Sequence, residues 1–478
     1  MTRRALLPHA LLLAAGVVTA ASIAAELPTP ESCIERASEA AAAAPVRQAQ
    51  LRYRCLVLRN GQRVLVGEAG APDASTVLLV HGLGGNAHRD WQRAVPALAA
   101  RFHVVTIDLP GFGGSPGAPQ GYSFAGLGAT LAEVLDATAP GQRVHVVGHS
   151  LGAAVGLYFA HAHPARVDRL VLVDAAGILL KNVFVQHMVS RRLPQVGVEQ
   201  VDRWLRGLDE RIDGIRRGMF GRLEEGFDFS RWLAQNPEIR HALLGAHTHV
   251  EAALGLVEHD FTSAIRETTA PTTVIWGAND PVAPLRTGKL LAGRMPDARL
   301  QVIDGAGHTP MLESPDAFNR LLLVGLAAPL PPRPVEPADG VSQGTVVCEN
   351  RANARYSGTF DSITLDHCAG ARIEGARMRQ LTLKSSSLTI ESSVIDSSDL
   401  ALSAQHSAVV ATDVRIRGRV AIRAEHSRLD LAGVSLQASE RGVEMPAPGR
   451  IFFSVSDWHG SDHDGDAHFP WPPPAAPR

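Results

Sequence analysis

The sequence lacks the features that mark several large classes of protein. Acidic and basic residues nearly balance, with a formal net charge of −2, so no basic surface for nucleic acid is indicated. Residues 60–327 contain no glycine fingerprint for a dinucleotide, no P-loop and no clustered metal-ligand motif. We therefore expect no cofactor, no metal and no nucleic acid. The length of 478 residues, 45% of them hydrophobic, allows two or three globular units.

Cysteine is also scarce, with four residues in the whole chain. They fall in two local pairs, Cys33 with Cys55 and Cys348 with Cys368. Four cysteines allow three pairings, but an even count divided between separate parts of the chain favours these two disulfides. Closing a loop of about 20 residues in this way stabilises a fold by about 3 kcal/mol in the chain-entropy treatment. Disulfides are typical of exported proteins.

The first residues have the pattern of an export signal. Arg3 and Arg4 precede an uncharged apolar stretch over 10–25, which ends in small residues suited to cleavage. The stretch is short for a membrane span, and no cysteine lies at the cleavage region to carry a lipid anchor. We expect a signal peptide at 1–25 and a protein that is periplasmic or secreted. Residues 26–50 are alanine-rich and predict a helical extension.

Ser150 occupies the most informative stretch of the chain. An apolar β-branched run leads into Gly-His-Ser-Leu-Gly at 148–152, and a helix of small residues is expected to follow. So sharp a strand-to-helix turn strains the serine backbone, and its neighbours must therefore be small. The turn raises the hydroxyl clear of the sheet near the positive end of the helix, as a nucleophile requires.

A serine nucleophile also needs a histidine that takes its proton and a carboxylate that orients the imidazole. Asp280 lies in the loop after the expected strand 272–276, and His308 follows the next expected strand, 300–303. Both residues stand just past the carboxyl ends of strands, where open α/β sheets place their sites. We therefore interpret Ser150, Asp280 and His308 as a catalytic triad.

Five ordered segments resemble the α/β-hydrolase superfamily, of the lid-bearing esterase, lipase and carbon–carbon hydrolase type. The matching segments are the oxyanion loop at 77–86, the following strand and turn at 104–115, the elbow at 148–152, and the loops of Asp280 and His308. The resemblance covers about 60–327. It implies the α/β-hydrolase fold over 51–327, a mostly parallel sheet with flanking helices, and a helical lid at about 177–265.

Other residues compete for the triad positions. Asp174 ends the expected strand 170–173 and is the stronger rival acid, because some relatives carry the acid there. Asp108 belongs to an Asp-x-Pro-Gly turn and is expected to be structural. His81 and His149 flank the site, where each is expected to make local hydrogen bonds. The remaining candidates are expected to be packed or solvated histidines: His145, His161 and His163.

An oxyanion hole needs two backbone N–H donors. Leu151, after the serine, offers one, and the resemblance implies Leu83 as the second. His308 would deprotonate Ser150 for attack on an ester carbonyl, and water would then release the acid. The aromatic residues of the lid favour a carboxylesterase or lipase for a small-molecule or lipid ester with an apolar acyl group. Carbon–carbon hydrolysis, acyl transfer and a non-catalytic surface-binding protein remain alternatives.

A proline-rich linker at 328–340 separates this unit from a segment of different character. A period of 20 aligns Ser387 with Ser407 and Ser427, and Val394 with Val414 and Val434. Short strands at such a period favour an all-β, parallel β-helix-like domain at 341–456, with a β-sandwich as the alternative. The domain would dock on the hydrolase or contact a glycan or protein. The histidines and aspartates of 457–478 would suit a metal, but their glycine and proline company favours a disordered tail.

Overall fold

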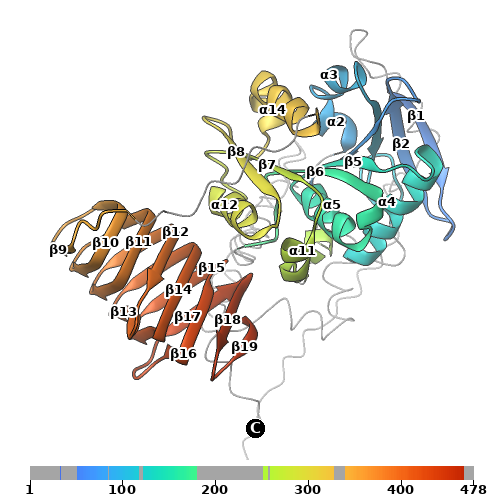
Figure 1. Cartoon of the computed structure of the whole chain (residues 1–478). Helices are drawn as coiled ribbons and strands as arrows, with labels where there is room; N and C mark the ends of the chain where they lie inside the picture. Colours follow the sequence, from blue (N-terminus) through green and yellow to red (C-terminus); the bar gives the residue numbers. More distant parts are fainter. Residues whose placement is uncertain are drawn as a thin grey trace, which may run out of the picture.

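The computed structural model describes Cys33 and residues 51–83, 86–117, 122–179, 251–253, 255–256, 259–327 and 340–467. They form an α/β unit followed by a β-rich domain (Figure 1). Four predicted segments lie outside the described residues: the signal peptide, the helical extension apart from Cys33, most of the lid, and the linker at 328–339. No described helix is long and apolar enough to cross a membrane.

The α/β unit is built on an eight-stranded sheet, in the order β1-β2-β4-β3-β5-β6-β7-β8. The strands are β1 Arg52–Val57, β2 Arg63–Ala69, β3 Thr76–Val80, β4 His103–Ile107, β5 Val144–His149, β6 Val167–Val173, β7 Thr272–Gly277 and β8 Ala298–Ile303. β2 pairs antiparallel with β1 and with β4, and the other pairs are parallel. The mostly parallel sheet predicted from the sequence is confirmed.

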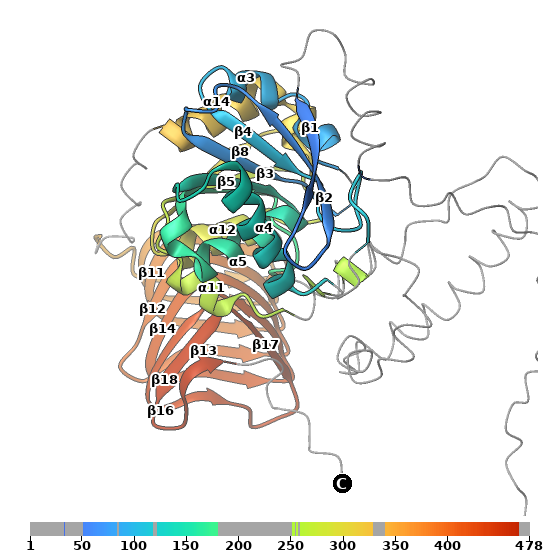
Figure 2. The same cartoon turned by 90° about the vertical axis from the view of Figure 1, so that its right-hand side faces the viewer.

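Helices cover both faces of this sheet, because side chains of a buried strand alternate between its faces. Val77 and Leu79 of β3 pack in one core with Trp91 and Phe318, whereas Leu78 and Val80 pack in the other. The first face carries α2 Ala87–Trp91, α3 Val95–Ala99, α13 Pro310–Glu313 and α14 Pro315–Ala327. The second carries α4 Phe124–Thr138, α5 Leu151–Ala162, α11 Thr262–Glu267 and α12 Leu285–Arg294 (Figure 2). A short 3₁₀ turn, η1, spans Pro164–Arg166.

The β-rich domain stacks short strands along one direction. They are β9 Thr345–Glu349, β10 Arg355–Asp366, β11 Ala371–Lys384, β12 Ser387–Asp396, β13 Leu400–Gln405, β14 Ala408–Glu425, β15 Arg428–Ala432, β16 Ser435–Glu444, β17 Arg450–Ser454, β18 Ser456–Gly460 and β19 Asp464–Ala467. β18 and β19 pair antiparallel, and the other described pairs of the domain are parallel. Apolar side chains from successive strands form one continuous core.

The predicted repeat agrees with the strand register in some rungs only. Leu402 pairs with Ile422, at the expected spacing of 20. Ser387, however, pairs with Ala408, and it is Ser386 whose N–H donates to Ser407 Oγ, over 3.1 Å and 21 residues. The predicted alignment of Ser387 with Ser407 is therefore wrong by one residue, because the turn of one rung contains one extra residue. The alignment of Val394 with Val414 fails in the same way, since Val394 pairs with Arg415.

The predicted disordered tail begins too early. Residues 457–467 belong to β18, β19 and the turn between them. Trp458 is 2% exposed, and its indole N–H donates to Asp462 Oδ1 over 3.1 Å. The same carboxylate accepts the N–H of Gly442, so that the turn is attached to the preceding rung. Burial of one large aromatic side chain outweighs the glycine-rich composition here. Residues 468–478 lie outside the described part of the chain.

Both predicted disulfides are present. Cys33 is joined to Cys55 at the edge strand β1, and Cys348 is joined to Cys368 at the start of the β-rich domain. All four cysteines are therefore in disulfides.

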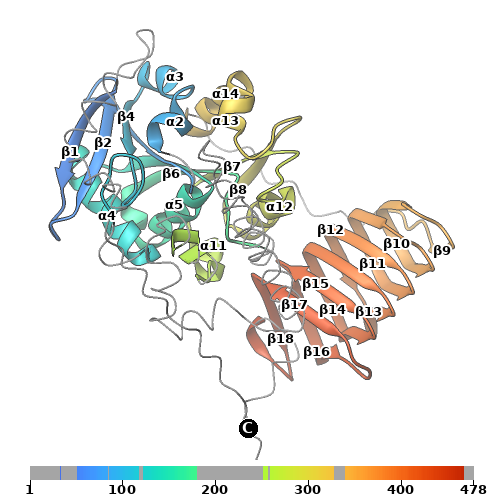
Figure 3. The same cartoon turned by 180° about the vertical axis from the view of Figure 1, so that it is seen from behind.

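Charged side chains hold the two parts of the molecule together. α12 lies against β14 and its neighbours (Figure 3). Arg286 donates to both carboxylate oxygens of Asp430, at 2.9 and 3.0 Å, and also to Thr412 Oγ1. Two further cations of the same helix pair with Glu391 and Asp457: Lys289 and Arg294. The helix that follows the Asp280 loop is therefore anchored to the β-rich domain.

Candidate active site

Ser150 forms the sharp turn that the sequence predicts between β5 and α5. Its backbone has φ 52° and ψ −113°, a conformation that side-chain-bearing residues rarely adopt. A Cβ added to Gly148 would lie 2.2 Å from the carbonyl oxygen of Gly152. A Cβ added to Gly152 would lie 2.2 Å from the carbonyl oxygen of Val80. Both glycines are therefore required by close backbone contacts.

The structure brings the three predicted residues together. His308 Nε2 lies 3.0 Å from Ser150 Oγ, and His308 Nδ1 lies 2.7 Å from Asp280 Oδ2. Asp280 Oδ1 accepts the N–H groups of Val282 and Ala283, at 2.7 and 3.0 Å. The carboxylate is fully buried, while His308 stays 19% exposed. The imidazole is thus oriented from one side and meets the serine hydroxyl on the other.

The protonation states of this pair suit base catalysis. Burial opposes ionisation of Asp280, but the hydrogen bond and the charge of His308, with the N–H groups of Ala283 and Val282, lower its pKa. Burial also lowers the pKa of His308, as does the charge of His149, although the hydrogen bond that its Nδ1–H donates to Asp280 opposes this. A neutral imidazole beside a charged carboxylate is able to accept the serine proton.

The predicted oxyanion loop passes beside the serine. A Cβ added to Gly82 would lie 3.1 Å from Ser150 Cβ and 2.8 Å from His149 Nδ1. Leu83 comes next along the chain, and Leu151 opens α5 directly after the serine. Leu83 therefore follows a glycine that lies against the serine turn, and Leu151 follows the serine itself. Their role towards an oxyanion stays a prediction.

Sequence reasoning missed Asp90, a buried residue of α2. Its Oδ2 accepts the N–H of Gly82 over 2.8 Å and lies 3.1 Å from His149 Nδ1. His149 Nε2 in turn donates to the carbonyl oxygen of His308 over 2.8 Å. His149 therefore bridges 159 residues of chain, and the expectation of local hydrogen bonds is wrong for this residue. Burial opposes ionisation of Asp90, but the contacts with His149, His81 and Gly82 lower its pKa.

A second missed carboxylate, Glu313, holds the loop of His308. Its Oε2 accepts the N–H of Gly307, and its Oε1 accepts the N–H and the hydroxyl of Thr309. A threonine followed by a glutamate at the start of a helix is close to a capping pattern, and this signal was available in the sequence. Nothing in the sequence marks Asp90, since its role depends on the burial of a short helix.

The rival acids have other partners. Asp108 accepts the N–H groups of Ala87 and Gly114, each at 2.8 Å, as a structural residue. Asp174 accepts the N–H of Gly277 over 2.9 Å, and it is Asp280 that hydrogen-bonds to His308.

The rival histidines also lie in other contacts. His81 accepts the N–H of Leu109 over 2.9 Å, within its own part of the fold. His145 lies 3.4 Å from Asp168 and packs edge-on against Phe102. The two histidines at the end of α5 contact other side chains: His161 faces Glu267 and His163 packs on Phe159.

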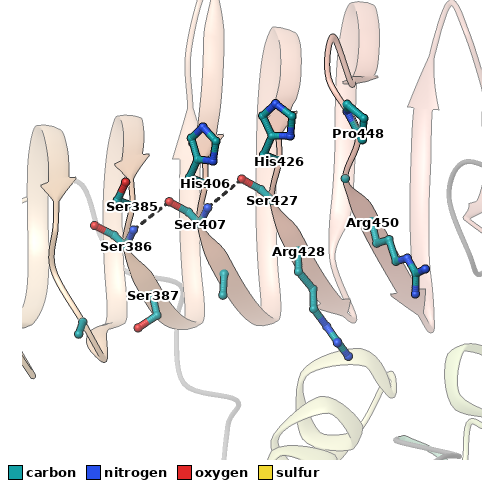
Figure 4. Close-up of a pocket in the computed structure, with 13 residues that line it drawn as sticks. Ser385, Ser386, Ser387, His406, Ser407, His426, Ser427, Arg428, Pro448 and Arg450 are labelled. Carbon is teal, nitrogen blue, oxygen red and sulfur yellow. Dashed lines mark hydrogen bonds between the residues drawn. The ribbon is translucent and has the colours of Figure 1, made fainter. Parts of the chain in front are cut away.

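A groove of about 720 Å³ runs along the turns of the β-rich domain. Figure 4 shows the rings of His406 and His426 on successive turns. The centroids of these two rings lie 4.8 Å apart. Arg428 and Arg450 also line it, and no triad residue does. This groove is therefore separate from the candidate triad.

A serine on a strand-to-helix turn, with an acid and a histidine after later strands of a mostly parallel sheet, defines the α/β hydrolases. The chain belongs to this family: the sequence profile described as "alpha/beta hydrolase fold" matches residues 75–315. That stretch contains Ser150, Asp280 and His308.

The chain is also similar to individual proteins. The chain is 32% identical to "2-hydroxy-6-oxononadienedioate/2-hydroxy-6-oxononatrienedioate hydrolase 2" of Pseudomonas putida, over 52% of this chain and 87% of the relative. It is 30% identical to "Pimeloyl-[acyl-carrier protein] methyl ester esterase" of Aeromonas hydrophila, over 52% of this chain and 93% of the relative. A solved structure of a hydrolase from Pseudomonas aeruginosa PA01 is 26% identical, with a TM-score of 0.44, over 58% of this chain and 98% of that one.

Proposed function

We propose that the protein is a serine hydrolase that cleaves carboxylic esters through an acyl-enzyme. The observation that carries this proposal is the hydrogen-bonded chain from Ser150 Oγ through His308 to buried Asp280, at a strained turn. A serine hydroxyl is a weak nucleophile at neutral pH and needs such a base.

In the proposed reaction, His308 Nε2 takes the proton of Ser150 as Oγ attacks the ester carbonyl. The N–H groups of Leu83 and Leu151 stabilise the negative oxygen of the tetrahedral intermediate. His308 then donates the proton to the leaving alkoxide, which departs as the alcohol. Water, deprotonated by His308, attacks the acyl-enzyme, and His308 then returns the proton to Ser150 Oγ as the acid leaves, so that no cofactor takes part.

The proposed substrate is a small-molecule or lipid ester with an apolar acyl group. The aromatic residues of the predicted lid and the methyl ester esterase among the relatives support this choice. A second candidate is carbon–carbon bond hydrolysis by the same triad. The name of the Pseudomonas putida relative, which refers to a 2-hydroxy-6-oxo dioate, favours this candidate. Acyl transfer to an acceptor other than water is a third use of the same acyl-enzyme.

Labelling with a fluorophosphonate probe tests the proposal. We expect one mole of label per mole of wild-type protein, located on Ser150, and no label on Ser150→Ala. A wild-type protein that folds but takes no label would favour a non-catalytic binding protein. A panel of p-nitrophenyl esters of increasing chain length, run beside a 2-hydroxy-6-oxo dienoate, then separates ester from carbon–carbon hydrolysis.

We also propose export to the periplasm or the medium, which the two disulfides support. Fractionation of the source cells, with thiol counting on the isolated protein, tests this. For the C-terminal part, we propose a parallel β-helix that contacts a glycan or a protein. The parallel register and the stacked core support the architecture, and a glycan array with the full chain tests the contact.

A further inference from the structure

Two buried carboxyl groups stand side by side behind His308. Asp174 follows β6 and Asp280 follows β7, and these strands are parallel neighbours with Val173 paired to Ile275. Both side chains are fully buried. One oxygen of each carboxyl group and one ring nitrogen of His308 all lie within 4.8 Å of one another. The proposed mechanism uses only one of the two carboxyl groups.

The oxygens of the two groups differ in their hydrogen bonds. Asp280 accepts from His308 with one oxygen and from two backbone N–H groups with the other. Asp174 Oδ1 accepts the N–H of Gly277, but its Oδ2 is buried with no hydrogen-bond partner among the described residues. A buried carboxylate oxygen without a donor is costly, whereas a protonated oxygen is itself a donor.

The surroundings of Asp174 favour its neutral form. The ionisable groups that face it are Asp280, Glu313 and His308. Burial raises the pKa of Asp174 well above its usual range and the charge of Asp280 adds to this, although the N–H of Gly277 opposes it. Two carboxyl groups this close share their charge unequally. Asp280, which faces the histidine and two N–H groups, takes the negative charge.

We propose that Asp174 is a neutral carboxylic acid that donates its Oδ2 proton to the carboxylate of Asp280. In this arrangement Asp174 is a positioning residue. It orients Asp280 from behind, as His308 and the turn at Val282 do from the other sides, and it adds no second charge to the site. This inference rests on the proposed function, because it assigns Asp280 as the triad acid.

The proposal makes asparagine the conservative replacement at this position. The carboxamide keeps an oxygen for the N–H of Gly277 and places an NH₂ donor towards Asp280. Asparagine also tolerates the left-handed backbone of residue 174, which has φ 43°. Alanine removes both hydrogen bonds and fits that backbone less well.

Kinetics of Asp174→Asn and Asp174→Ala test the assignment. We expect Asp174→Asn to keep kcat within a few-fold of wild type. Asp174→Ala should lose about 10- to 100-fold in activity, mostly in kcat, which is the loss typical when a group that orients a metal ligand is removed. The acid limb of the kcat/KM profile should stay in place in Asp174→Asn. If Asp174 were ionised, its replacement would remove a negative charge near His308 and move that limb to lower pH. Such a shift, or a loss in Asp174→Asn as large as in Asp280→Asn, would overturn the proposal.

Infrared spectroscopy gives a readout that needs no activity. At neutral pH the wild-type protein should show the carbonyl stretch of a buried neutral carboxylic acid. The band should be absent from Asp174→Asn and present in Ser150→Ala. Asp108→Asn is the matched control and should leave the band unchanged, because both oxygens of Asp108 accept backbone N–H groups. A wild-type protein without the band would overturn the proposal.

Two further measurements distinguish other interpretations of Asp174, Asp280 and His308. Loss of wild-type activity in EDTA, restored by a divalent cation but not in Asp174→Asn, would make the three side chains a metal site and overturn the proposal. A protein that shows the band but takes no fluorophosphonate label would refute the proposed function and leave the protonation of Asp174 in place. The stability of each variant is checked by its unfolding temperature, so that misfolding of Asp174→Ala is recognised.

Discussion

The two parts of the molecule bring side chains together across very different lengths of chain. In the α/β unit, Ser150 and His308 hydrogen-bond across 158 residues. In the β-rich domain, the N–H of Ser407 donates to Ser427 Oγ, only 20 residues away. The first arrangement exists only in the completed fold, whereas the second is built rung by rung. Substitutions of the triad residues should therefore abolish chemistry, and substitutions between the rungs of the second part should reduce stability.

The sharpest contrast comes from the same substitution in both parts. Ser150→Ala should reduce kcat by about 10⁶, because the triad acts as a unit. Ser407→Ala should leave kcat unchanged and cost about 1 kcal/mol of stability, because its buried hydroxyl bonds two backbone groups. Ester turnover and thermal unfolding of both variants check this. Burst kinetics retained in Ser150→Ala would contradict the assignment of the nucleophile.

Asp280→Asn should reduce kcat by about 10⁴ with little change in KM, since the imidazole loses its orienting charge. The measurement is steady-state kinetics on a soluble ester, with Asp174→Asn run in parallel. If Asp174→Asn reduced kcat far more than Asp280→Asn, the acid of the triad would be Asp174, after β6, and not Asp280, after β7.

The contact between the two parts is tested through its most buried cation. Arg286 is 12% exposed in its side chain, and it holds Asp430, Thr412 and a backbone carbonyl. Arg286→Gln should weaken the contact by about 2 kcal/mol, a value reduced from that of a fully buried pair because Asp430 is partly exposed. Calorimetric unfolding and limited proteolysis measure this. Arg419→Gln, which removes exposed ion pairs to Asp399 and Glu440, is the control and should show no measurable change.

The pH profile reports the electrostatics of the site. In the proposed reaction His308 accepts a proton only when it is neutral, and burial lowers its pKa below the ordinary value of 6.5. The acid limb of kcat/KM should therefore have its midpoint below that value, and activity should persist to lower pH than with an unperturbed imidazole. A midpoint above 6.5 would mean that Asp280 outweighs burial in the working enzyme.

Removal of the β-rich domain should have only a small effect on turnover. All proposed catalytic groups precede residue 328, so truncation after Ala327 should leave kcat on a small ester within a few-fold. Stability should fall, because α12 loses its partners. The comparison requires folded, monodisperse protein well below its unfolding temperature. A folded truncation that loses turnover by orders of magnitude would show that the domain completes the site.

Local patterns were sufficient for much of the fold. The run into Ser150 predicts β5, the turn and α5, because strand propensity and two close-packed glycines act within a few residues. The hairpin of β1 and β2 turns at Asn60-Gly61, a pair typical of such turns, and Gly61 has φ 81°. The positions of Asp280 and His308 after successive strands predict that they meet, since parallel strands end at one edge.

Other features depend on contacts that no local pattern records. Asp90 gains its role by burial of α2 against the oxyanion loop, and His149 by reaching the carbonyl of His308. The order of the tail depends on Trp458, which is buried against the preceding rungs of the β-rich domain. The register at Ser386 depends on the turn of one rung, which contains one extra residue.

The sequence by itself predicted the fold family, the nucleophile turn, the candidate nucleophile and base, and both disulfides, because each depends on residue types at short spacing or in a fixed chain order. Only the tertiary structure decided which carboxyl group faces His308, and it left Asp174 Oδ2 without a hydrogen-bond partner among the residues that the structure describes. Both aspartates follow strands, and their spacing along the chain does not distinguish them. Their hydrogen bonds and burial are set by side chains far away in sequence, and these contacts form only when the sheet is complete.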